Sequence, residues 1–280
     1  MYKIIIDSCG ELPENLKKDE HFCNVPLELD VDGYLITDDD TFDQLDFLKR
    51  VKNSVKGPKS SCPSPERYMS AFDGDADNIY VITLSGKLSG SYNSAVLAKG
   101  LYEEEHGKDS KNIYVFNSKS ASIGETIIGL KVQEYEEAGL AFDDVVKKTE
   151  EYIASMNTFF VLETLETLRK AGRLSNIKAF VANTLNIKPV MGSTKEGTIQ
   201  QLGRARGMKK ALMKMVEDAV ASTKDCSERI LAISHCNCPQ RAEFVKEQIL
   251  KLAKFKAVVV VNTAGVSSMY ANDGGVILAV

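Results

Sequence analysis

The chain has 280 residues, of which 44% are hydrophobic and 26% are charged, and its formal net charge is −4. This composition is that of a globular protein and excludes the disordered and collagen-like classes. The acidic balance provides no overall attraction to nucleic acid or to an anionic membrane. At this length we expect two domains, because a single hydrophobic core rarely grows beyond roughly 250–300 residues.

The beginning of the chain leads directly into a short strand pattern, Tyr2 to Asp7, without an apolar signal region. No later run approaches the length of a membrane span. We therefore expect a cytoplasmic protein whose six cysteines are reduced. His235, Cys236 and Cys238 form a metal-like cluster without a second ligand pair nearby, so the pattern favours a strand end followed by a loop. We expect no metal and no cofactor.

Strands and helices alternate in the first half of the chain. Short β-branched runs predict strands at 3–7, 79–84 and 112–116. Thr41 and Gln44 have the spacing of a capping box, with apolar residues at helical spacing after it. The acidic run Asp38, Asp39, Asp40 is read as a turn leading to the Thr41 cap. Further helices are predicted at 91–101, 125–137 and 143–156.

This alternation predicts an α/β fold with a parallel sheet that is covered by helices on both faces, a three-layer arrangement. Ligands of such sheets bind at the carboxyl ends of the strands. Three polar segments fall at these ends: Asp7 with Ser8, residues 85–91, and Asn117 with Ser118.

Beyond residue 157 the pattern predicts a second α/β domain. Some connections between its strands are too short for a helical crossover, so its sheet should be mixed. We therefore divide the chain into domains 1–157 and 158–280, with a cleft between them. The predicted strands are 159–162, 187–190, 198–202, 230–234, 258–262 and 276–280, and the predicted helices are 165–170, 208–221 and 240–252.

Two hydroxyl-rich turns flank the predicted strand 79–84. The first is 60–65, in which Ser64 and Pro65 read as an N-cap with proline at the first helical position. The second is 85–91, which precedes another helix. Backbone N–H groups at a helix start, together with hydroxyls, suit an anionic group. The pattern indicates a site that holds a carboxylate or phosphate more than one that breaks a bond.

Common motifs of nucleotide binding and hydrolysis are absent from the sequence. Gly86 and Lys87 lack the P-loop pattern, which needs glycine five residues before Gly86 and serine or threonine directly after Lys87. Val81 and Leu88 occupy these positions. No serine has glycines two residues to either side, as a hydrolase elbow requires, and no Gly-x-Gly-x-x-Gly follows the first strand. A serine hydrolase or phosphoryl-transfer enzyme with Ser89 or Ser61 as nucleophile and His235 as base stays open.

Basic residues in the second half allow two readings at each position. Gly172 reads as a helix C-cap, and Arg173 as a ligand contact or as a solvated charge. A cluster at the start of a predicted helix reads as a solvated face or as a contact for phosphate, an acidic partner or DNA. That cluster comprises Arg204, Arg206, Lys209 and Lys210.

Taken together and in order, the motifs resemble those of the DegV family of bacterial fatty-acid-binding proteins. The resemblance extends over nearly the whole chain, although each motif alone is weak. Ala171 replaces one glycine of the family's Gly-Gly-Arg-Ile-Ser segment. The matching segments are 7–13, 25–27, 60–65, 88–92, 165–175, which ends at Ser175, 186–189, 206–211, and His235 with Ala242 and Glu243.

The resemblance implies a two-domain α/β protein that buries a long-chain fatty acid. It also implies that the acid is presented to a separate kinase subunit, which forms an acyl-phosphate for phospholipid synthesis. Carried over residue by residue, the carboxylate would meet Ser61, Ser60 and Ser89 with Gly90, and Arg173 would lie near the head group. Ser60 replaces a more frequent threonine and keeps the hydroxyl.

The chain departs from the family pattern at two positions. Tyr270 stands where members commonly have a histidine, and Asn117 replaces a frequent aspartate. A tyrosine hydroxyl can still hydrogen-bond, so we expect Tyr270 to contact the ligand, but it cannot act as an imidazole.

Overall fold

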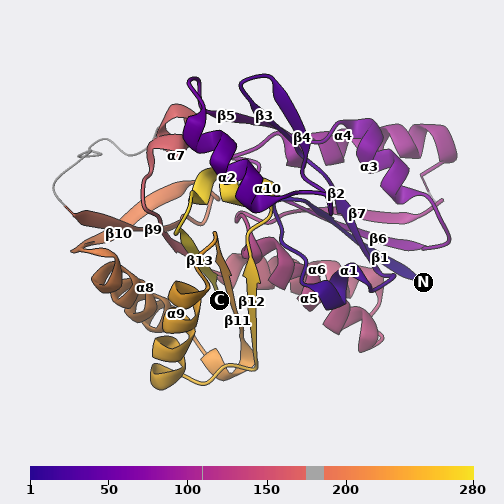
Figure 1. Cartoon of the computed structure of the whole chain (residues 1–280). Helices are drawn as coiled ribbons and strands as arrows, with labels where there is room; N and C mark the ends of the chain where they lie inside the picture. The colour runs from indigo at the N-terminus through magenta and orange to yellow at the C-terminus, as the bar shows by residue number, and fades with distance from the viewer. Residues whose placement is uncertain (109, 175–185) are drawn as a thin grey trace.

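The computed structural model describes residues 1–108, 110–174 and 186–280 and arranges them in three sheets and their covering helices (Figure 1). Ser175 lies outside the described residues. The first sheet is parallel with strand order β2-β1-β6-β7, and the second has the order β10-β9-β8-β13-β11-β12. A small third sheet has the order β4-β3-β5. The predicted α/β class, with a parallel sheet first and a mixed sheet second, is confirmed.

The parallel sheet is built from the β-branched runs at the start of the chain. Its strands are β1 (Tyr2–Asp7), β2 (Phe22–Val25), β6 (Asn78–Thr83) and β7 (Asn112–Asn117). The helices α3 (Pro65–Phe72) and α4 (Ser91–His106) cover one face, and α5 (Ile123–Glu137) and α6 (Phe142–Ser155) cover the other (Figure 1). The sheet therefore forms the middle of three layers.

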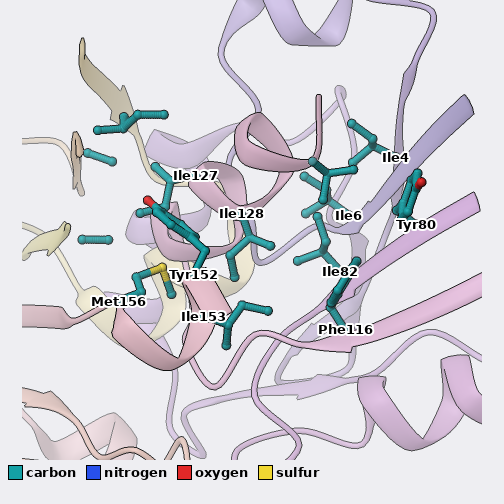
Figure 2. Packing of buried hydrophobic residues seen from close by; sticks show 14 of the residues in the cluster. Ile4, Ile6, Tyr80, Ile82, Phe116, Ile127, Ile128, Tyr152, Ile153 and Met156 are labelled. Carbon is teal, nitrogen blue, oxygen red and sulfur yellow. The ribbon is translucent and has the colours of Figure 1, made fainter. Parts of the chain in front are cut away.

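Side chains of β1 alternate between the two cores because successive residues of a strand point to opposite faces. Ile4 and Ile6 pack toward α5 and α6, whereas Ile5 packs toward α3 and α4. Figure 2 shows Ile4, Ile6 and Ile82 facing the helix residues Ile127 and Ile128. All five are fully buried, so truncating any of them to alanine is expected to cost about 2–5 kcal/mol.

The second sheet is mixed: β9 and β10 form an antiparallel hairpin, and β13 runs antiparallel to both β8 and β11. Only β11 and β12 pair in parallel among its described strands. Helix α5 contacts this sheet as well as the first, since Ala232 and Ala279 belong to the same core as Ile127. The elements are β8 (Thr158–Val161), β9 (Ile187–Ser193), β10 (Ile199–Arg206), β11 (Ile230–His235), β12 (Ala257–Asn262) and β13 (Val276–Ala279), with α8 (Met208–Ser222) and α9 (Pro239–Leu252) on the other face.

The third sheet was not predicted from the sequence. Strands β3 (Glu28–Val31), β4 (Tyr34–Thr37) and β5 (Pro58–Ser61) pair antiparallel. Ser60 and Ser61 therefore end a strand instead of lying in a turn. The sequence of β5, Pro-Lys-Ser-Ser, has no apolar alternation, so its pairing with β3 through the backbone left no pattern to recognise.

Several predicted helix boundaries change in the structure. The capping box at Thr41 is wrong: α2 (Gln44–Asn53) begins later, and the Asp43 side chain accepts the Asp46 backbone N–H at 3.0 Å. Asp43 is the better cap because its carboxylate reaches the third residue of the helix. Helix α4 extends to His106, well beyond residue 101. The short helices are α1 (Glu14–Lys17), α7 (Glu166–Lys170), α10 (Gly265–Ala271) and the 3₁₀ turn η1 (Cys226–Glu228).

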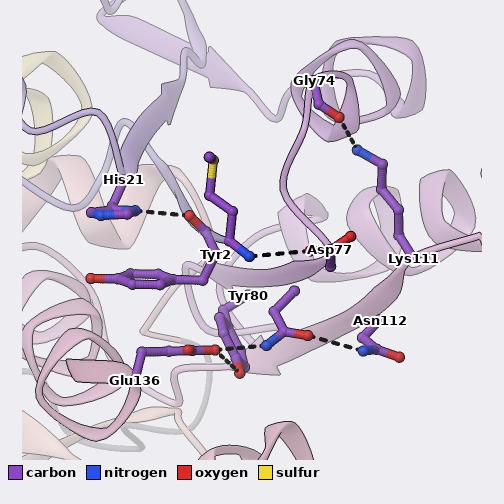
Figure 3. Close-up of polar contacts among 10 residues, drawn as sticks. Tyr2, His21, Gly74, Asp77, Tyr80, Lys111, Asn112 and Glu136 are labelled. Atoms are coloured by element: carbon purple, nitrogen blue, oxygen red, sulfur yellow. Dashed lines mark hydrogen bonds and ion pairs between the residues drawn. The ribbon is translucent and has the colours of Figure 1, made fainter. Parts of the chain in front are cut away.

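Polar contacts close the amino end of the parallel sheet (Figure 3). Glu136 of α5 accepts the Tyr80 hydroxyl at 2.6 Å and the Asn78 amide at 3.0 Å. The N-terminal amine contacts Asp77 at 3.1 Å. These contacts leave the opposite, carboxyl end of the sheet as the place for a ligand.

Among the helices of the described part of the chain, none combines the length and apolarity that a membrane crossing needs. The division at residue 157 lies between α6 and β8 and stays a prediction.

Candidate functional site

A cavity of about 320 Å³ opens at the carboxyl ends of β1 and β6. Cys9, just beyond β1, and Leu84, just beyond β6, line it. The chain proceeds from β1 to β2 on one side and later to β6 on the other, so these strands flank a topological switch point. Loops diverge at such a point and leave a crevice, which is where open α/β sheets bind ligands. The volume lies within the range of about 300–1,000 Å³ typical of small-molecule sites.

All six residues predicted for the site line this single cavity. They come from four separate parts of the chain: the end of β5, the start of α4, the turn after α7, and α10. They are Ser60, Ser61, Ser89, Gly90, Arg173 and Tyr270. The structure therefore brings them together, whereas their roles toward a ligand stay a prediction.

The start of α4 lies directly against the end of β5. Gly90 is the N-cap, and a β-carbon there would lie 3.0 Å from Sγ of Cys62, so only glycine fits without a shift of Cys62. Ser94 of α4 donates its hydroxyl to the Pro63 carbonyl at 2.6 Å. Ser89 accepts the Ser91 backbone N–H at 3.2 Å, which orients the Ser89 hydroxyl at the helix start.

Arg173 is held by the turn that ends α7. Gly172 has φ +74°, its N–H donates to the Arg169 carbonyl, and the Arg173 N–H donates to the Leu168 carbonyl. This pattern is a Schellman motif, so the predicted C-cap glycine is confirmed. The Arg173 guanidinium donates through Nε to the Leu88 carbonyl at 3.0 Å and through Nη1 to the Ala171 carbonyl at 2.5 Å. Arg173 thus ties the two halves of the chain beside Ser89.

Tyr270 faces the predicted serines from α10. Its hydroxyl lies 3.4 Å from Oγ of Ser60. Asn117, the second departure from the family pattern, accepts the backbone N–H groups of Gly86 and Lys119 at 3.2 and 3.1 Å. The Asn117 side chain therefore shapes the turns around the cavity without lining it.

The rest of the cavity wall is largely aliphatic and comes from both halves of the chain. Leucines after β6 and in the 85–91 turn meet side chains of β8, α7, β10 and β13. A chain of methylenes would contact carbon on most sides in this part. The apolar lining comprises Leu27, Leu84, Leu88, Phe160, Leu162, Leu168, Ile199, Val266 and Ile277.

Several hydroxyls of the wall were missed by sequence reasoning. Ser120 and Thr158 lie 2.6 Å apart and join the turn after β7 to the start of β8. Ser122 donates to the Glu11 carboxylate at 2.8 Å. The position of Ser118 after the strand at 112–116 pointed to this turn but did not reveal which hydroxyls face inward. The missed hydroxyls are Ser120, Ser122, Thr158, Ser193, Thr198 and Ser267.

Buried carboxyl groups lie behind this wall. Burial raises the pKa of Glu11 to about 7 and the pKa of Asp38 to about 6. Burial also raises the pKa of Asp7 and, more strongly, the pKa of Glu125. Repulsion between neighbouring carboxylates raises the pKa values of Glu11, Asp38 and Glu125 further, because adjacent carboxylates in a dry environment cannot all ionise.

Asp38 corrects the reading of the acidic run as a plain turn. It is 2% exposed and accepts the backbone N–H groups of Gly265 and Val266 at 2.6 and 2.9 Å. Ser8 donates its hydroxyl to the same carboxylate at 2.9 Å. The side chain therefore fixes α10, which carries Tyr270, to the end of β1. Asp39 accepts from Thr41 and forms the expected turn.

The structure does not assemble the alternative hydrolase site. His235 is absent from the cavity lining that contains Ser61 and Ser89, and its Nδ1 accepts the Cys238 backbone N–H at 3.3 Å. Within residues 1–108, 110–174 and 186–280, no group of three histidine, cysteine, aspartate or glutamate side chains has a geometry that could hold a metal. The segment 235–238 is a strand end followed by a loop, as the sequence indicated.

The basic cluster does not lie at a helix start alone. Arg204 and Arg206 belong to β10, and Lys209 and Lys210 belong to α8. All four side chains are exposed, and none lines the cavity. The solvated-face reading fits this placement, since the four residues do not converge on a pocket.

Comparisons with known proteins agree with the fold and the motif order. A family model described as an uncharacterised protein of the DegV family matches residues 1–279. A DegV domain-containing protein of Streptococcus pyogenes is 34% identical over 279 residues, covering 99% of this chain and 98% of that protein.

Solved structures that are similar over the full length include two that are described with a fatty acid. A DegV family protein from Ruminococcus gnavus, described with vaccenic acid, has a TM-score of 0.97 and 52% identity, covering 100% of this chain and 99% of that one. The Fatty Acid Kinase (Fak) B3 protein of Streptococcus pneumoniae, loaded with linoleic acid, has a TM-score of 0.89 and 31% identity, covering 99% and 98%. The family match and the identity over the whole length show that this chain belongs to the DegV family.

Proposed function

We propose that the protein binds a long-chain fatty acid in the 320 Å³ cavity, with the carboxylate held by serine hydroxyls. The observation that carries this proposal is the convergence of three serines, Gly90 and Arg173 on a cavity whose remaining wall is aliphatic apart from a second group of hydroxyls around Ser120 and Thr158. Ser61 donates to the carboxylate, with Ser60 and Tyr270 beside it. Ser89 donates as well once its hydroxyl hydrogen turns from Oγ of Ser91, which it contacts at 3.2 Å. The bonds of Arg173 to Leu88 and Ala171 use neither hydrogen of Nη2, which supplies a positive charge for the head group.

The two parts of the ligand have different energetic roles. Burying about fourteen methylenes at roughly 0.8 kcal/mol each contributes on the order of 11 kcal/mol before entropy losses. Each hydrogen bond to the carboxylate adds roughly 1.5–3 kcal/mol. The aliphatic wall therefore supplies affinity, and the hydroxyls supply orientation.

The same reasoning assigns a role to each half of the chain. Residues 1–157 provide the head-group serines together with Leu27, Leu84 and Leu88. Residues 158–280 provide Arg173 and Tyr270 beside the serines and most of the wall against the tail, namely Phe160, Leu162, Leu168, Ile199, Val266 and Ile277. We propose these two ranges as the domains of the protein.

A kinase subunit is the proposed partner. The similar protein from Streptococcus pneumoniae carries fatty acid kinase in its name and was loaded with linoleic acid. The proposal is that this chain presents the carboxylate to such a kinase, which transfers the phosphoryl group of ATP and forms the acyl-phosphate. The protein itself acts as a binding subunit and not as an enzyme.

The test of carboxylate binding is the double variant Ser61→Ala with Ser89→Ala, assayed by displacement of a fluorescent fatty acid. Losing two charge-assisted hydrogen bonds is expected to cost about 3–6 kcal/mol, or about 10²–10⁴-fold in Kd. Ser70→Ala with Ser110→Ala, at sites outside the cavity lining, is the matched control. Unchanged affinity in the cavity variant would contradict the proposed cradle.

Presentation to a kinase is tested separately with the loaded protein, ATP and a purified fatty acid kinase subunit. Acyl-phosphate should form only when all three are present. The positive control is the same kinase with the fatty-acid-binding subunit of its own organism. If the kinase forms acyl-phosphate with that subunit but not with this protein, the proposed partnership is refuted.

A further inference from the structure

The strand β12 forms an unprotected edge of the second sheet. It lies last in the strand order, and within the described residues its sheet pairing is with β11 alone (Figure 1). Its sequence is Ala-Val-Val-Val-Val-Asn, without proline or charge. The opposite edge, β10, carries Arg204 and Arg206. Proteins commonly protect an edge with charges or proline, because an open apolar edge invites another strand.

The side chains of β12 divide between two faces. Val259 and Val261 pack against the core shared with α5. Val258 and Val260 point to the other face and are 37% and 38% exposed. An added strand would cover both exposed valines by cross-strand contact and would pair the open backbone groups.

Charges of opposite sign lie at the two ends of this strand. Exposed Lys254 precedes it. At its other end, the last residues of the strand and the two that follow it, 260–264, line a groove of about 430 Å³ together with Glu14, Asp39 and Asp40. One lysine in that groove, Lys17, contacts Glu14 and Asp40 at 3.2 and 3.1 Å. The groove therefore keeps an excess of negative charge.

We propose that β12 pairs with β12 of a second copy of this chain in an antiparallel, two-fold dimer. A two-fold axis through Val259 places Val258 of each copy opposite Val260 of the other. It also places Lys254 opposite Ala264 of the second copy, beside the acidic groove. Antiparallel pairing brings the first end of one strand beside the last end of the other. Because the axis is two-fold, each of these contacts occurs twice, as in any isologous interface. The strand is thus complementary to itself in both apolar and charged positions.

The test is analytical ultracentrifugation of the full chain over a series of concentrations. The unmodified protein should dimerise reversibly, and added salt should weaken the dimer. Val260→Lys should raise the dimer dissociation constant at least about tenfold, because it places a charge in both valine pairs. Val96→Lys on α4, at a position that is 43% exposed, is the matched control and should leave the dimer unchanged.

A second pair of variants addresses the charges without altering the strand. Lys254→Glu should weaken the dimer, and Lys251→Glu, at another exposed lysine on α9, should not. The two lysine variants test the dimer even if Val260→Lys fails to fold.

Disulfide cross-linking tests the proposed register of the two β12 strands. In a Cys62→Ser background, Val258→Cys and Val260→Cys chains should form a disulfide when mixed and oxidised, whereas either chain alone should not. Opposed Cα atoms in an antiparallel pair lie about 4.5–5.5 Å apart, within the disulfide range.

A monomer at every concentration, or a dimer insensitive to both Val260→Lys and Lys254→Glu, would overturn the proposal. Fatty-acid affinity of Val260→Lys and of Lys254→Glu should not change, since neither residue lines the fatty-acid cavity, so failure of this proposal leaves the binding site untouched.

Discussion

The two ends of the parallel sheet use the same strands for opposite purposes. At the amino end, Glu136 satisfies the hydroxyl of Tyr80 and the amide of Asn78. At the carboxyl end, the loops after β1 and β6 diverge and leave the cavity lined by Ser89 and Ser61. One end therefore stabilises the sheet through hydrogen-bonded polar groups, whereas the other keeps space and hydroxyls for a ligand.

The largest expected effect comes from filling the carboxyl end. Ala121→Phe places a ring in the cavity that Ala121 lines. Each methylene kept out costs roughly 0.8 kcal/mol, so displacing five weakens fatty-acid binding about a thousandfold. Isothermal titration with a long-chain fatty acid measures this loss. Ala138→Phe, at the exposed end of α5, controls for the substitution, and equal loss in both variants would argue against the cavity as the site.

At the amino end, a substitution is expected to have a smaller effect, and to lower stability instead of ligand affinity. Glu136→Ala leaves the hydroxyl of fully buried Tyr80 without its acceptor, which should lower the free energy of unfolding by about 1–3 kcal/mol. Urea denaturation measures this change, while ligand affinity should stay constant. The neighbouring exposed Glu137→Ala is the control. Weaker ligand binding in the Glu136 variant alone would show that the two ends are not separate.

The smallest effect concerns the carboxyls behind the cavity wall. Burial raises the pKa of Glu11 from 4.5 to about 7, so the folded protein binds a proton that the unfolded chain releases. This contribution to stability is full below pH 4.5 and is lost as the pH rises through about 7. Glu11→Gln should therefore flatten the fall in unfolding temperature between acidic and neutral pH. An unchanged pH profile would show that Glu11 does not bind this proton.

Much of the fold was predictable because its strands are short, apolar runs separated by polar turns. The strands at 3–7 and 230–234 match β1 and β11 within one residue. The third sheet was not predictable, since β5 has no apolar alternation and exists through backbone pairing with β3. The role of Asp38 was also hidden, because its carboxylate accepts the backbone N–H groups of Gly265 and Val266, which lie far along the chain.

The candidate site was predictable to a different degree. The two hydroxyl-rich turns that hold Ser61 and Ser89 were found because helix starts and strand ends leave local sequence signals. The individual contact residues, including Arg173 and Tyr270, were assigned through the family resemblance. The aliphatic wall was not predictable, because Phe160 and Leu162 resemble ordinary core residues until the structure shows the space beside them.

The cavity at the carboxyl end of the parallel sheet is proposed to hold a long-chain fatty acid. The decisive experiment is native mass spectrometry of the purified full chain, with the bound molecule identified after release. We expect one fatty acid per chain in the unmodified protein and its loss from the Ser61→Ala, Ser89→Ala variant. A chain that carries no lipid, and takes up none when long-chain fatty acids are added, would contradict it.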